Sequence, residues 1–423
     1  MKILQAYKFQ LQLKVEQSQQ MKQFAGCCRF VWNHGLATEK DNYEQGGKYL
    51  GYNSLAKQLT GWKREVKTAF LATVHSQILQ QSLRHLDRAY KEFMSGKRGF
   101  PKLKKRGQQD SFTYPQGFKV DEPNSRIYLP KIGWVRYRKS RDIQGLPKNV
   151  TISLSCDKWY VSIQTEQEVA EPIHSSLSSV GIDMGIANFA TLSDGTQIAS
   201  PNALTKHLKK LSKLQRQMAK KVKGSGHWLK AKKRVSKLHS KIKNIRNDFL
   251  HKTSTMICKT HATIVLEELK IKNNVAVDAC TPLCGYRHGP SAHPLGRLSR
   301  SAAGTIENPG KNVRAKSGLN RLILDQGWGE FKRQLQYKAT WNGGKVVFVP
   351  PQYTSQQCSQ CGHTEKENRK TQAKFKCLAC GYKTHADYNA ALNILAAGHA
   401  VIAHGVGKAQ APTRKCEPTY GVA

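Results

Sequence analysis

The sequence is poor in acidic residues. Its 423 residues contain 28 Asp and Glu against 69 Lys and Arg, which gives a formal net charge of +41. This excess is spread along most of the chain rather than confined to a tail. Such a field attracts polyanions and disfavours a compact state without one. We therefore expect nucleic acid as the partner.

Long hydrophobic runs are also missing. The nearest approach, residues 390–407, is uncharged but contains Asn393, His399, His404 and several glycines, so we expect no membrane span. The first residues, 1–8, lack the apolar segment of a signal peptide. We find no amphipathic anchor and no lipidation signal. These absences exclude the membrane surface as the expected partner and favour the cytoplasm.

Cysteine occurs in an odd number, eleven, and four of these residues form a pattern. Two Cys-x2-Cys pairs, each followed by a glycine, are separated by fifteen residues, which is the spacing of a four-thiolate zinc site. Four thiolates complete a tetrahedron and leave no position for water, so we expect a structural Zn²⁺ on Cys358, Cys361, Cys377 and Cys380. The remaining seven suit reduced thiols in a cytosol: Cys27, Cys28, Cys156, Cys258, Cys280, Cys284 and Cys416.

Three carboxylates lie at the ends of predicted elements. Residues 180–195 read as a strand, a tight turn and a second strand, with Asp183 at the end of the first. Residues 262–269 read as a buried strand that ends in Glu267 and Glu268, which face opposite ways by alternation. Asp387 begins a short helix that we expect to end near residue 397, and its local sequence alone favours a helix N-cap.

These acids suggest a second kind of metal site. Mg²⁺ prefers oxygen ligands, and paired ions about 4 Å apart clamp the attacking and leaving oxygens of a phosphodiester. Asp183, Glu267 and Asp387 together could hold two Mg²⁺ ions. This requires three distant segments to converge, which the sequence alone cannot show.

The pattern of the chain before residue 180 changes twice. An alternating strand at 2–13 is followed by helical spacing through 17–95. Short strands then follow at 126–130, 133–138, 150–154 and 158–164. With the first strand they could close a small barrel in which the helices are an insertion. Residues 166–179 read as a polar linker.

Two segments are unusually basic. In residues 96–106 glycine and proline interrupt a run that includes Lys102, Lys104, Lys105 and Arg106, which favours phosphate contact over a merely solvated loop. Residues 206–249 carry sixteen Lys and Arg against one acid, Asp248, and read as a helical hairpin that turns at 224–226. We favour nucleic-acid contact there over a solvated face, through Lys209, Lys210, Lys220, Lys221, Lys232, Lys233 and Arg234.

Several blocks resemble the signature of TnpB, the transposon-encoded, RNA-guided endonuclease that is related to type V CRISPR effectors. The blocks occur in the same order over about residues 1–400. They are Gly181-Ile-Asp-Met-Gly-Ile186, Asp248-Phe-Leu-His-Lys252, Leu266-Glu-Glu-Leu-Lys270, Gln326-Gly-Trp-Gly-Glu-Phe-Lys-Arg-Gln-Leu335, Ser355-Gln-Gln-Cys-Ser-Gln-Cys-Gly362 and Ala386-Asp-Tyr-Asn-Ala-Ala-Leu-Asn393.

The resemblance implies a fold of α/β and β-barrel parts. An RNase H-like (RuvC) nuclease domain would comprise 180–350 and 387–398, including a basic hairpin at 203–250, with a zinc ribbon at 351–386 inserted before the last acid. A wedge β-barrel would comprise 1–15 and 96–170 and carry a helical recognition insertion at 16–95. The tail, 399–423, is expected to be disordered.

The resemblance also implies a function: RNA-guided, Mg²⁺-dependent cleavage of double-stranded DNA beside a short adjacent motif, in the prokaryotic cytoplasm near the nucleoid. The guide would be an RNA from the transposon end, and a monomer is expected rather than a stable homodimer. Asp183, Glu267 and Asp387 match the catalytic acids. The positions that match the family's contacts to the adjacent motif are Tyr52, Gln80, Tyr114 and Gln116.

One segment departs from the family pattern. Residues 275–312 intervene before the Gly-Trp-Gly-Glu block and form an atypical insertion in the lid region. A second metal site on Cys280, Cys284, His288 and His293 is disfavoured, because Cys284 and His288 are too close in sequence for a finger. Two other functions remain open: a guided DNA-binding repressor with a silent nuclease, and a transposase that acts directly in strand transfer.

Overall fold

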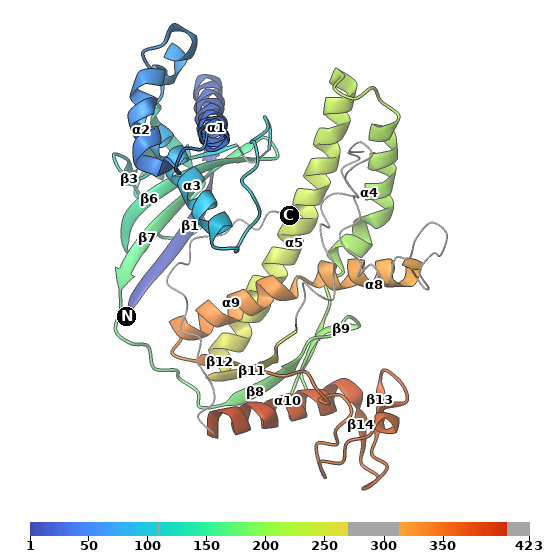
Figure 1. The fold of residues 1–423 in the computed structure, drawn as a ribbon. Coiled ribbons are helices and arrows are strands. Elements are labelled where there is room, and N and C mark those ends of the chain that lie inside the picture. The colour runs from blue at the N-terminus through green and yellow to red at the C-terminus, as the bar shows by residue number, and fades with distance from the viewer. Residues whose placement is uncertain (109, 270–312, 404–423) are drawn as a thin grey trace. The chain divides into compact units, whose positions relative to one another are not determined.

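The computed structural model of the chain describes residues 1–108, 110–269 and 313–403. Within it the chain forms two compact units, Met1–Ala170 and the part from Glu171 onward (Figure 1). The boundary falls inside the segment 166–179. The atypical insertion with its four candidate ligands, and the tail from residue 404, lie outside the described residues.

Unit 1 is built on a seven-stranded antiparallel sheet. The strand order is β2-β6-β7-β1-β5-β4-β3. The central strand β1 pairs with β7 from Lys2↔Glu168 to Gln10↔Tyr160, and with β5 at Leu11 and Gln12. The bounds are β1 Lys2–Gln12, β2 Ser111–Tyr114, β3 Lys119–Asp121, β4 Arg126–Leu129, β5 Gly133–Tyr137, β6 Leu146–Ser155 and β7 Lys158–Glu168.

The five strands expected from alternation and turn residues are all present in this sheet. β2 and β3 were not predicted, although β2 is no shorter than the predicted strand β4. In the part of unit 1 that the structure describes, no ladder joins β2 to β3, so these two strands are the edges of the sheet. The expected barrel is therefore seen as a sheet with two free ends.

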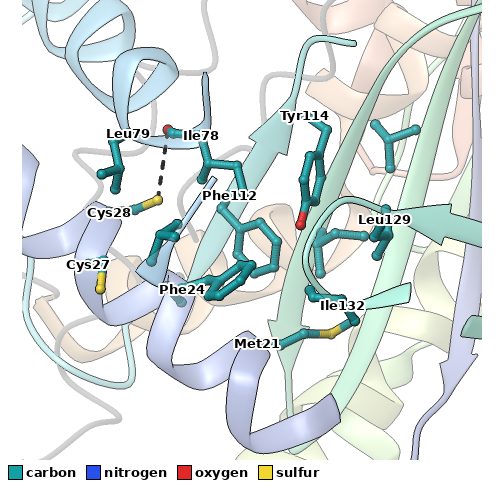
Figure 2. Close-up of a cluster of buried hydrophobic side chains, with 14 of the residues drawn as sticks. Met21, Phe24, Cys27, Cys28, Ile78, Leu79, Phe112, Tyr114, Leu129 and Ile132 are labelled. Carbon is teal, nitrogen blue, oxygen red and sulfur yellow. Dashed lines mark hydrogen bonds between the residues drawn. The ribbon is translucent and has the colours of Figure 1, made fainter. Parts of the chain in front are cut away.

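Helices pack against this sheet, chiefly at its edge strand β2. They are α1 Val15–Glu44, α2 Gly51–Trp62, the short 3-10 helix η1 Val66–Thr73 and α3 Ser76–Met94. Figure 2 shows Phe24 of α1 against Phe112 of β2, whose rings form an edge-on pair with centroids 5.9 Å apart. The Cys28 thiol, buried in the same cluster, donates to the carbonyl of Ile78 at the start of α3. Helices and sheet thus share one core.

Unit 2 contains a five-stranded mixed sheet of order β10-β9-β8-β11-β12. Its strands are β8 Ser179–Asp183, β9 Asn188–Leu192, β10 Gln197–Ala199, β11 Thr263–Glu267 and β12 Lys345–Val349. β8, β11 and β12 are parallel, and β9 and β10 are added by antiparallel hairpins. β11 lies between two parallel neighbours, and all five of its residues are buried, as its β-branched run predicted.

Helices lie on both faces of the second sheet (Figure 1). Val180 and Ile182 of β8 pack in one core cluster with residues of α5 and α9, whereas Val265 of β11 packs with Ile394 of α10. Alternation along the strands thus separates the two faces. The helices and small elements are α4 Ala203–Ala219, α5 Gly226–Thr260, α8 Val313–Gln326, α9 Trp328–Trp341, η3 Lys366–Arg369, β13 Lys374–Lys376, β14 Lys383–His385 and α10 Ala386–Ala403.

Helix α10 is longer than its sequence predicted. We expected it to end near residue 397 and to be followed by a disordered tail from 399, but the helix continues to Ala403, so the prediction is wrong for 399–403. The reason is tertiary. Gly398 lies so close to β11 that a Cβ at this position would be 2.4 Å from a methyl carbon of Val265. This glycine lets the helix continue along the sheet instead of ending it.

None of the helices in the described part of the chain combines the length and apolar character that a bilayer crossing needs.

Candidate functional site

Two of the predicted acids end neighbouring strands. β8 and β11 are parallel, and their ladder runs to the pair Leu266↔Ile182, which leaves Asp183 and Glu267 as the next residues at the same end. Residues 181 and 265 face α10, because a Cβ on Gly181 would be 2.3 Å from the carbonyl oxygen of Ala391. By alternation Asp183 and Glu267 also face α10. The sheet therefore brings both carboxylates to the helix that carries the third acid.

The surroundings of Asp183 disfavour its ionised form. Burial and the nearby carboxylates of Glu267 and Asp387 together raise the pKa of this carboxyl to about 7, while Arg369 opposes the rise. These interactions show that all three acids share one region of unit 2. Three carboxylates with one arginine leave an excess of negative charge, which is the environment a divalent cation would stabilise.

Glu267 is buried, with 8% of its surface exposed, whereas Glu268 is exposed. This separation is the one that alternation predicted. One carboxylate oxygen, Oε1, accepts a hydrogen bond of 2.6 Å from the hydroxyl of Thr354, and Lys332 of α9 donates to the backbone carbonyl of Glu267. Burial raises the pKa of Glu267, and the Thr354 hydroxyl and the Lys332 ammonium oppose this rise.

Asp387 lies in the first turn of α10, because the helix begins one residue earlier, at Ala386. Its Oδ1 atom accepts a hydrogen bond of 3.1 Å from the Arg369 guanidinium, which belongs to η3. No hydrogen bond from Asp387 to the helix N-terminus is seen among the described residues. Asp387 is therefore not the N-cap that the local sequence favours. It is a carboxylate in the first helical turn, at the positive end of the helix dipole, and it is paired with Arg369.

The four cysteines of the two knuckles form one cluster. Their sulfur atoms all lie within 4.8 Å of one another, with 3.7 Å between Cys358 and Cys380 and 3.6 Å between Cys361 and Cys377. Four thiolates about 2.3 Å from a tetrahedral Zn²⁺ are about 3.8 Å apart, so the residues fit this ion. Backbone N–H groups of Cys380 and Ala379 lower the pKa of Cys377 to about 6, which favours the thiolate that binds metal.

The acids are more widely spaced than the cysteines. In the described ranges, the cysteines are the only group of three or more acidic, histidine or cysteine side chains whose ligand atoms all lie within 4.8 Å. Asp183, Glu267 and Asp387 therefore do not form a closed cage for a single ion in this structure. Their oxygen chemistry fits Mg²⁺.

Buried asparagines tie the cysteine cluster to α10. Asn389 accepts from the backbone N–H of Ser359 and donates to the carbonyl of Gln357, and Asn393 donates to the carbonyls of Gln357 and Thr354. Asn368, also buried, bonds to both knuckle segments through its amide. Sequence reasoning missed these residues. The signal was present in the polar positions 389 and 393 on an otherwise apolar helix.

The basic hairpin has the predicted form. α4 and α5 pack along Leu211, Met218, Val235 and Leu238, and Ser225 caps α5 by accepting from the Trp228 N–H at 3.2 Å. The predicted contacts Lys209, Lys210, Lys220, Lys221, Lys233 and Arg234 are exposed. The half-buried Lys232 lies over the Trp228 ring, 5.3 Å from its centroid.

The base of this hairpin is held by an ion pair that the sequence did not reveal. The buried Asp325 of α8 accepts from the Arg246 guanidinium at 2.6 Å and from the backbone N–H of Leu204 at 2.9 Å. One carboxylate thus joins α8 to α5 and to the start of α4. The two residues of this ion pair are far apart in sequence, so no local sequence pattern predicts their contact.

The predicted contacts of unit 1 differ in their surroundings. Tyr114 is fully buried and its hydroxyl donates to the carbonyl of Pro130 at 3.0 Å, so its role in this structure is to hold the turn that exposes Gln116. Tyr52 lies beneath the Arg84 guanidinium, 4.9 Å from the ring centroid, and Gln80 is half-buried on α3. The expectation that Tyr114 itself offers a contact surface is corrected by its burial.

Lys104 also differs from its neighbours. Its ammonium lies 3.8 Å from the centroid of the Trp32 ring, and burial lowers its pKa to about 8. The backbone of the same residue exchanges two hydrogen bonds with the side chain of Asn33. This lysine docks the basic segment on α1. The exposed members of the segment are Lys102, Lys105 and Arg106.

Comparison with known proteins decides the family. Residues 162–278 match the family OrfB_IS605, described as "Probable transposase", and residues 328–394 match "Cas12f1-like, TNB domain". A protein of Escherichia coli (strain K12) named "Putative RNA-guided DNA endonuclease InsQ" is 53% identical over 419 residues, which span 99% of this chain and 98% of that protein.

The chain belongs to the TnpB family.

Two further comparisons agree with the assignment of this chain to the TnpB family. A Streptomyces pristinaespiralis protein with the name "Putative RNA-guided DNA endonuclease" is 29% identical over 410 residues, 96% of this chain and 92% of that protein. A cryo-EM structure of a Cas12f1-sgRNA-target DNA complex matches with a TM-score of 0.51 and 16% identity over 90% of this chain and 83% of that one, which shows a similar fold.

A third family match concerns the N-terminus. Residues 1–48 match a family described as "Helix-turn-helix domain". In this TnpB chain the same residues form the strand β1 and one continuous helix of 30 residues, α1. The match therefore identifies related sequences, and the description of the fold comes from the structure.

Proposed function

We propose that this chain is a transposon-encoded, RNA-guided, Mg²⁺-dependent DNA endonuclease that cleaves target DNA beside a short adjacent motif. The observation that carries the nuclease part is the convergence of Asp183, Glu267 and Asp387 on one face of the second sheet. The similarity over nearly the whole chain to a protein named as an RNA-guided DNA endonuclease supports the guided part.

Asp183, Glu267 and Asp387 are the residues that would hold Mg²⁺. When bound there, the metal would stabilise negative charge on the reacting phosphate oxygens and favour a hydrolytic attack. The chain's own groups prepare this site. The sheet presents two carboxylates at one strand end, α10 brings the third, and Thr354 and Arg369 each hold one carboxylate oxygen by a hydrogen bond.

In the domain arrangement that we propose, unit 2 contains a RuvC-like nuclease domain with an inserted zinc ribbon. The mixed sheet with helices on both faces, and the tetrahedral spacing of the cysteines, support this. The antiparallel sheet of unit 1, which is open between β2 and β3, would correspond to the wedge barrel, and its α1–α3 region to the recognition insertion. We propose a monomer in the prokaryotic cytoplasm, associated with the nucleoid.

The proposed partners are a guide RNA from the transposon end and double-stranded target DNA. The net charge of +41 and the exposed lysines of α4 and α5 support contact with phosphates. Guide pairing would supply most of the sequence specificity, while the protein holds the backbone of the heteroduplex and contacts the adjacent motif. Gln116, exposed beside the turn that Tyr114 holds, is the strongest candidate in unit 1 for such a contact.

The test is to co-express the chain with its own downstream DNA, purify it, and sequence the RNA that remains bound. DNA matched to that RNA is then offered with Mg²⁺, beside a mismatched DNA and the variant Asp183→Ala. We expect a discrete RNA and cuts in matched DNA only, with none from the variant.

The alternatives predict different results. A discrete RNA with DNA binding but no cuts would indicate a guided repressor. No bound RNA, with joining of transposon ends, would indicate a transposase that acts directly. The presence of all three acids in the sequence supports the nuclease over the repressor.

A further inference from the structure

Thr354 connects the zinc-binding segment to Glu267, the acid at the end of β11. Its hydroxyl donates to Oε1 of Glu267 at 2.6 Å, and both side chains are buried, each with 8% exposure. The alternative acceptor, the carbonyl of Pro351, is 3.4 Å away and receives at most a weak bond. In the described part of the chain, this hydroxyl is the only hydrogen-bond donor to the Glu267 carboxylate.

Thr354 is itself held from α10. The amide of Asn393 donates to the Thr354 carbonyl at 2.9 Å and to the Gln357 carbonyl at 2.7 Å. Gln357 directly precedes the zinc-cluster residue Cys358. Asn393 follows Asp387 by six residues on the same helix. A continuous set of hydrogen bonds therefore runs from the first knuckle, through Asn393 and Thr354, to Glu267, and its last two bonds are buried.

Resting on the proposed nuclease function, we propose that Thr354 is a positioning residue that fixes the Glu267 carboxylate for divalent metal binding, and that Asn393 holds Thr354 in register with the zinc ribbon. Glu267 has three rotatable side-chain bonds, and a hydrogen bond to one oxygen leaves the other oxygen of the carboxylate for the metal. A ribbon that is out of place would then weaken Mg²⁺ binding without removing any acid.

The chemistry of the contact supports a positioning role. Groups that hydrogen-bond to metal ligands orient them, and removing such a group commonly costs 10- to 100-fold in metal affinity or activity. A threonine whose only role is to fill space would tolerate valine, which has nearly the same shape. The hydroxyl, rather than the methyl group, is therefore the part of the side chain to test.

The experiment compares Thr354→Val with Thr354→Ser in the full chain with its bound RNA. For each protein, Mg²⁺ is titrated while thermal stability is followed, and the rate of guided cleavage is measured over the same range. We expect Thr354→Val to raise the Mg²⁺ concentration for half-maximal effect by roughly 10- to 100-fold in both measurements. Thr354→Ser, which keeps the hydroxyl, should stay within about threefold of the wild type.

Zinc content and bound RNA are the controls for folding, and both should be unchanged in the two variants. An unchanged Mg²⁺ midpoint in Thr354→Val would overturn the proposal, as would an equal loss in Thr354→Ser. If the wild type responds to Mg²⁺ but cuts no DNA, the proposed function fails while the thermal titration still decides the role of Thr354. If the wild type shows no Mg²⁺ response, the proposal is overturned together with the metal site.

A pair of asparagines tests the link to the ribbon. Asn389 and Asn393 lie one turn apart on α10 and both donate to the Gln357 carbonyl, but only Asn393 contacts Thr354. Asn393→Ala should therefore raise the Mg²⁺ midpoint in the same direction as Thr354→Val, and Asn389→Ala should raise it less. Equal midpoints in the two asparagine variants would overturn the role of Asn393 and leave the Thr354 contact to the first experiment.

Discussion

Asp183 is the residue whose chemistry depends most on its neighbours. Its position at the end of β8 and beside two other carboxylates makes it costly to ionise and favourable to pair with a cation. Asp183→Asn should reduce guided cleavage by at least about 1,000-fold, because the neutral amide is a poor ligand for Mg²⁺. Bound RNA and affinity for matched DNA should be unchanged, which gel-shift and cleavage assays on the same preparation would measure. Cleavage near the wild-type rate would contradict the assignment.

The raised pKa of Asp183 also predicts a pH dependence of stability without Mg²⁺. The carboxyl binds its proton more tightly in the folded chain, with a pKa of about 7, than in the unfolded chain, where it is 3.8. Its contribution to stability is therefore present below about pH 4 and is lost as the pH rises through 7, by at most about 4 kcal/mol.

Asp183→Asn lacks this titration. In Mg²⁺-free buffer with zinc retained, the melting temperature of the variant relative to that of the wild type should increase from pH 5 to pH 8. Added Mg²⁺ should reduce this increase. A constant difference between the two proteins at all pH values would show that Asp183 titrates normally.

Among the elements, helix α10 packs closely against β8. A Cβ at Gly181 of β8 would be 2.3 Å from the Ala391 carbonyl oxygen of the helix, a distance that the backbone cannot accept. Gly181→Ala should therefore destabilise unit 2 by about 1–3 kcal/mol or more, seen as a lower melting temperature. Gly329→Ala on α9 is the matched control, because nothing lies within 4 Å of its added methyl. A similar loss in both variants would contradict the close packing of α10.

Loss of zinc from the ribbon should also affect the parts of unit 2 that contact it. Cys361→Ser should lower the zinc content from about one ion per chain and expose the segment 358–380 to limited proteolysis, because four ligands hold its two knuckles together. Since Asn389 and Asn393 join this segment to α10, guided cleavage should fall as well. Cys258→Ser, at a buried cysteine outside the cluster, is the control and should keep its zinc. Full zinc content in Cys361→Ser would exclude the four-thiolate site.

At the scale of the whole molecule, charge governs the behaviour that we expect. The affinity for nucleic acid should fall steeply with salt, and replacing Lys209, Lys210, Lys220 and Lys221 by glutamine should reduce the slope by roughly 0.9 for each phosphate that the variant no longer neutralises. Lys104→Gln is the control, because this lysine is packed over Trp32. Its replacement should change the stability of unit 1 rather than the salt dependence of the affinity. Binding curves at several salt concentrations would measure both. An unchanged slope in the fourfold variant would remove α4 from the nucleic-acid surface.

Much of the organisation of this molecule was predictable from local patterns. Alternation located β1, a strand-turn-strand pattern located the strand that carries Asp183, and a β-branched run located the strand that carries Glu267. Alternation also separated the buried Glu267 from the exposed Glu268. The two Cys-x2-Cys pairs predicted the cysteine cluster, because four soft ligands at this spacing have few other uses. The positions of the three acids at the ends of predicted elements made them candidates before any geometry was known, and the ordered family blocks then matched them to the catalytic acids.

The tertiary structure decided what depends on contacts between distant segments. Four contacts are of this kind: the pairing of Arg369 with Asp387, the bond from Thr354 to Glu267, the bond from the Tyr114 hydroxyl to Pro130, and the packing of Lys104 over Trp32. The local sequences of these residues do not indicate which partner each will contact. The end of α10 at Ala403 belongs to the same class, because it depends on packing against β11. A pattern of neighbours in sequence determines which faces are apolar and which residue types are present. Only the register of strands and the approach of helices determines which of them meet.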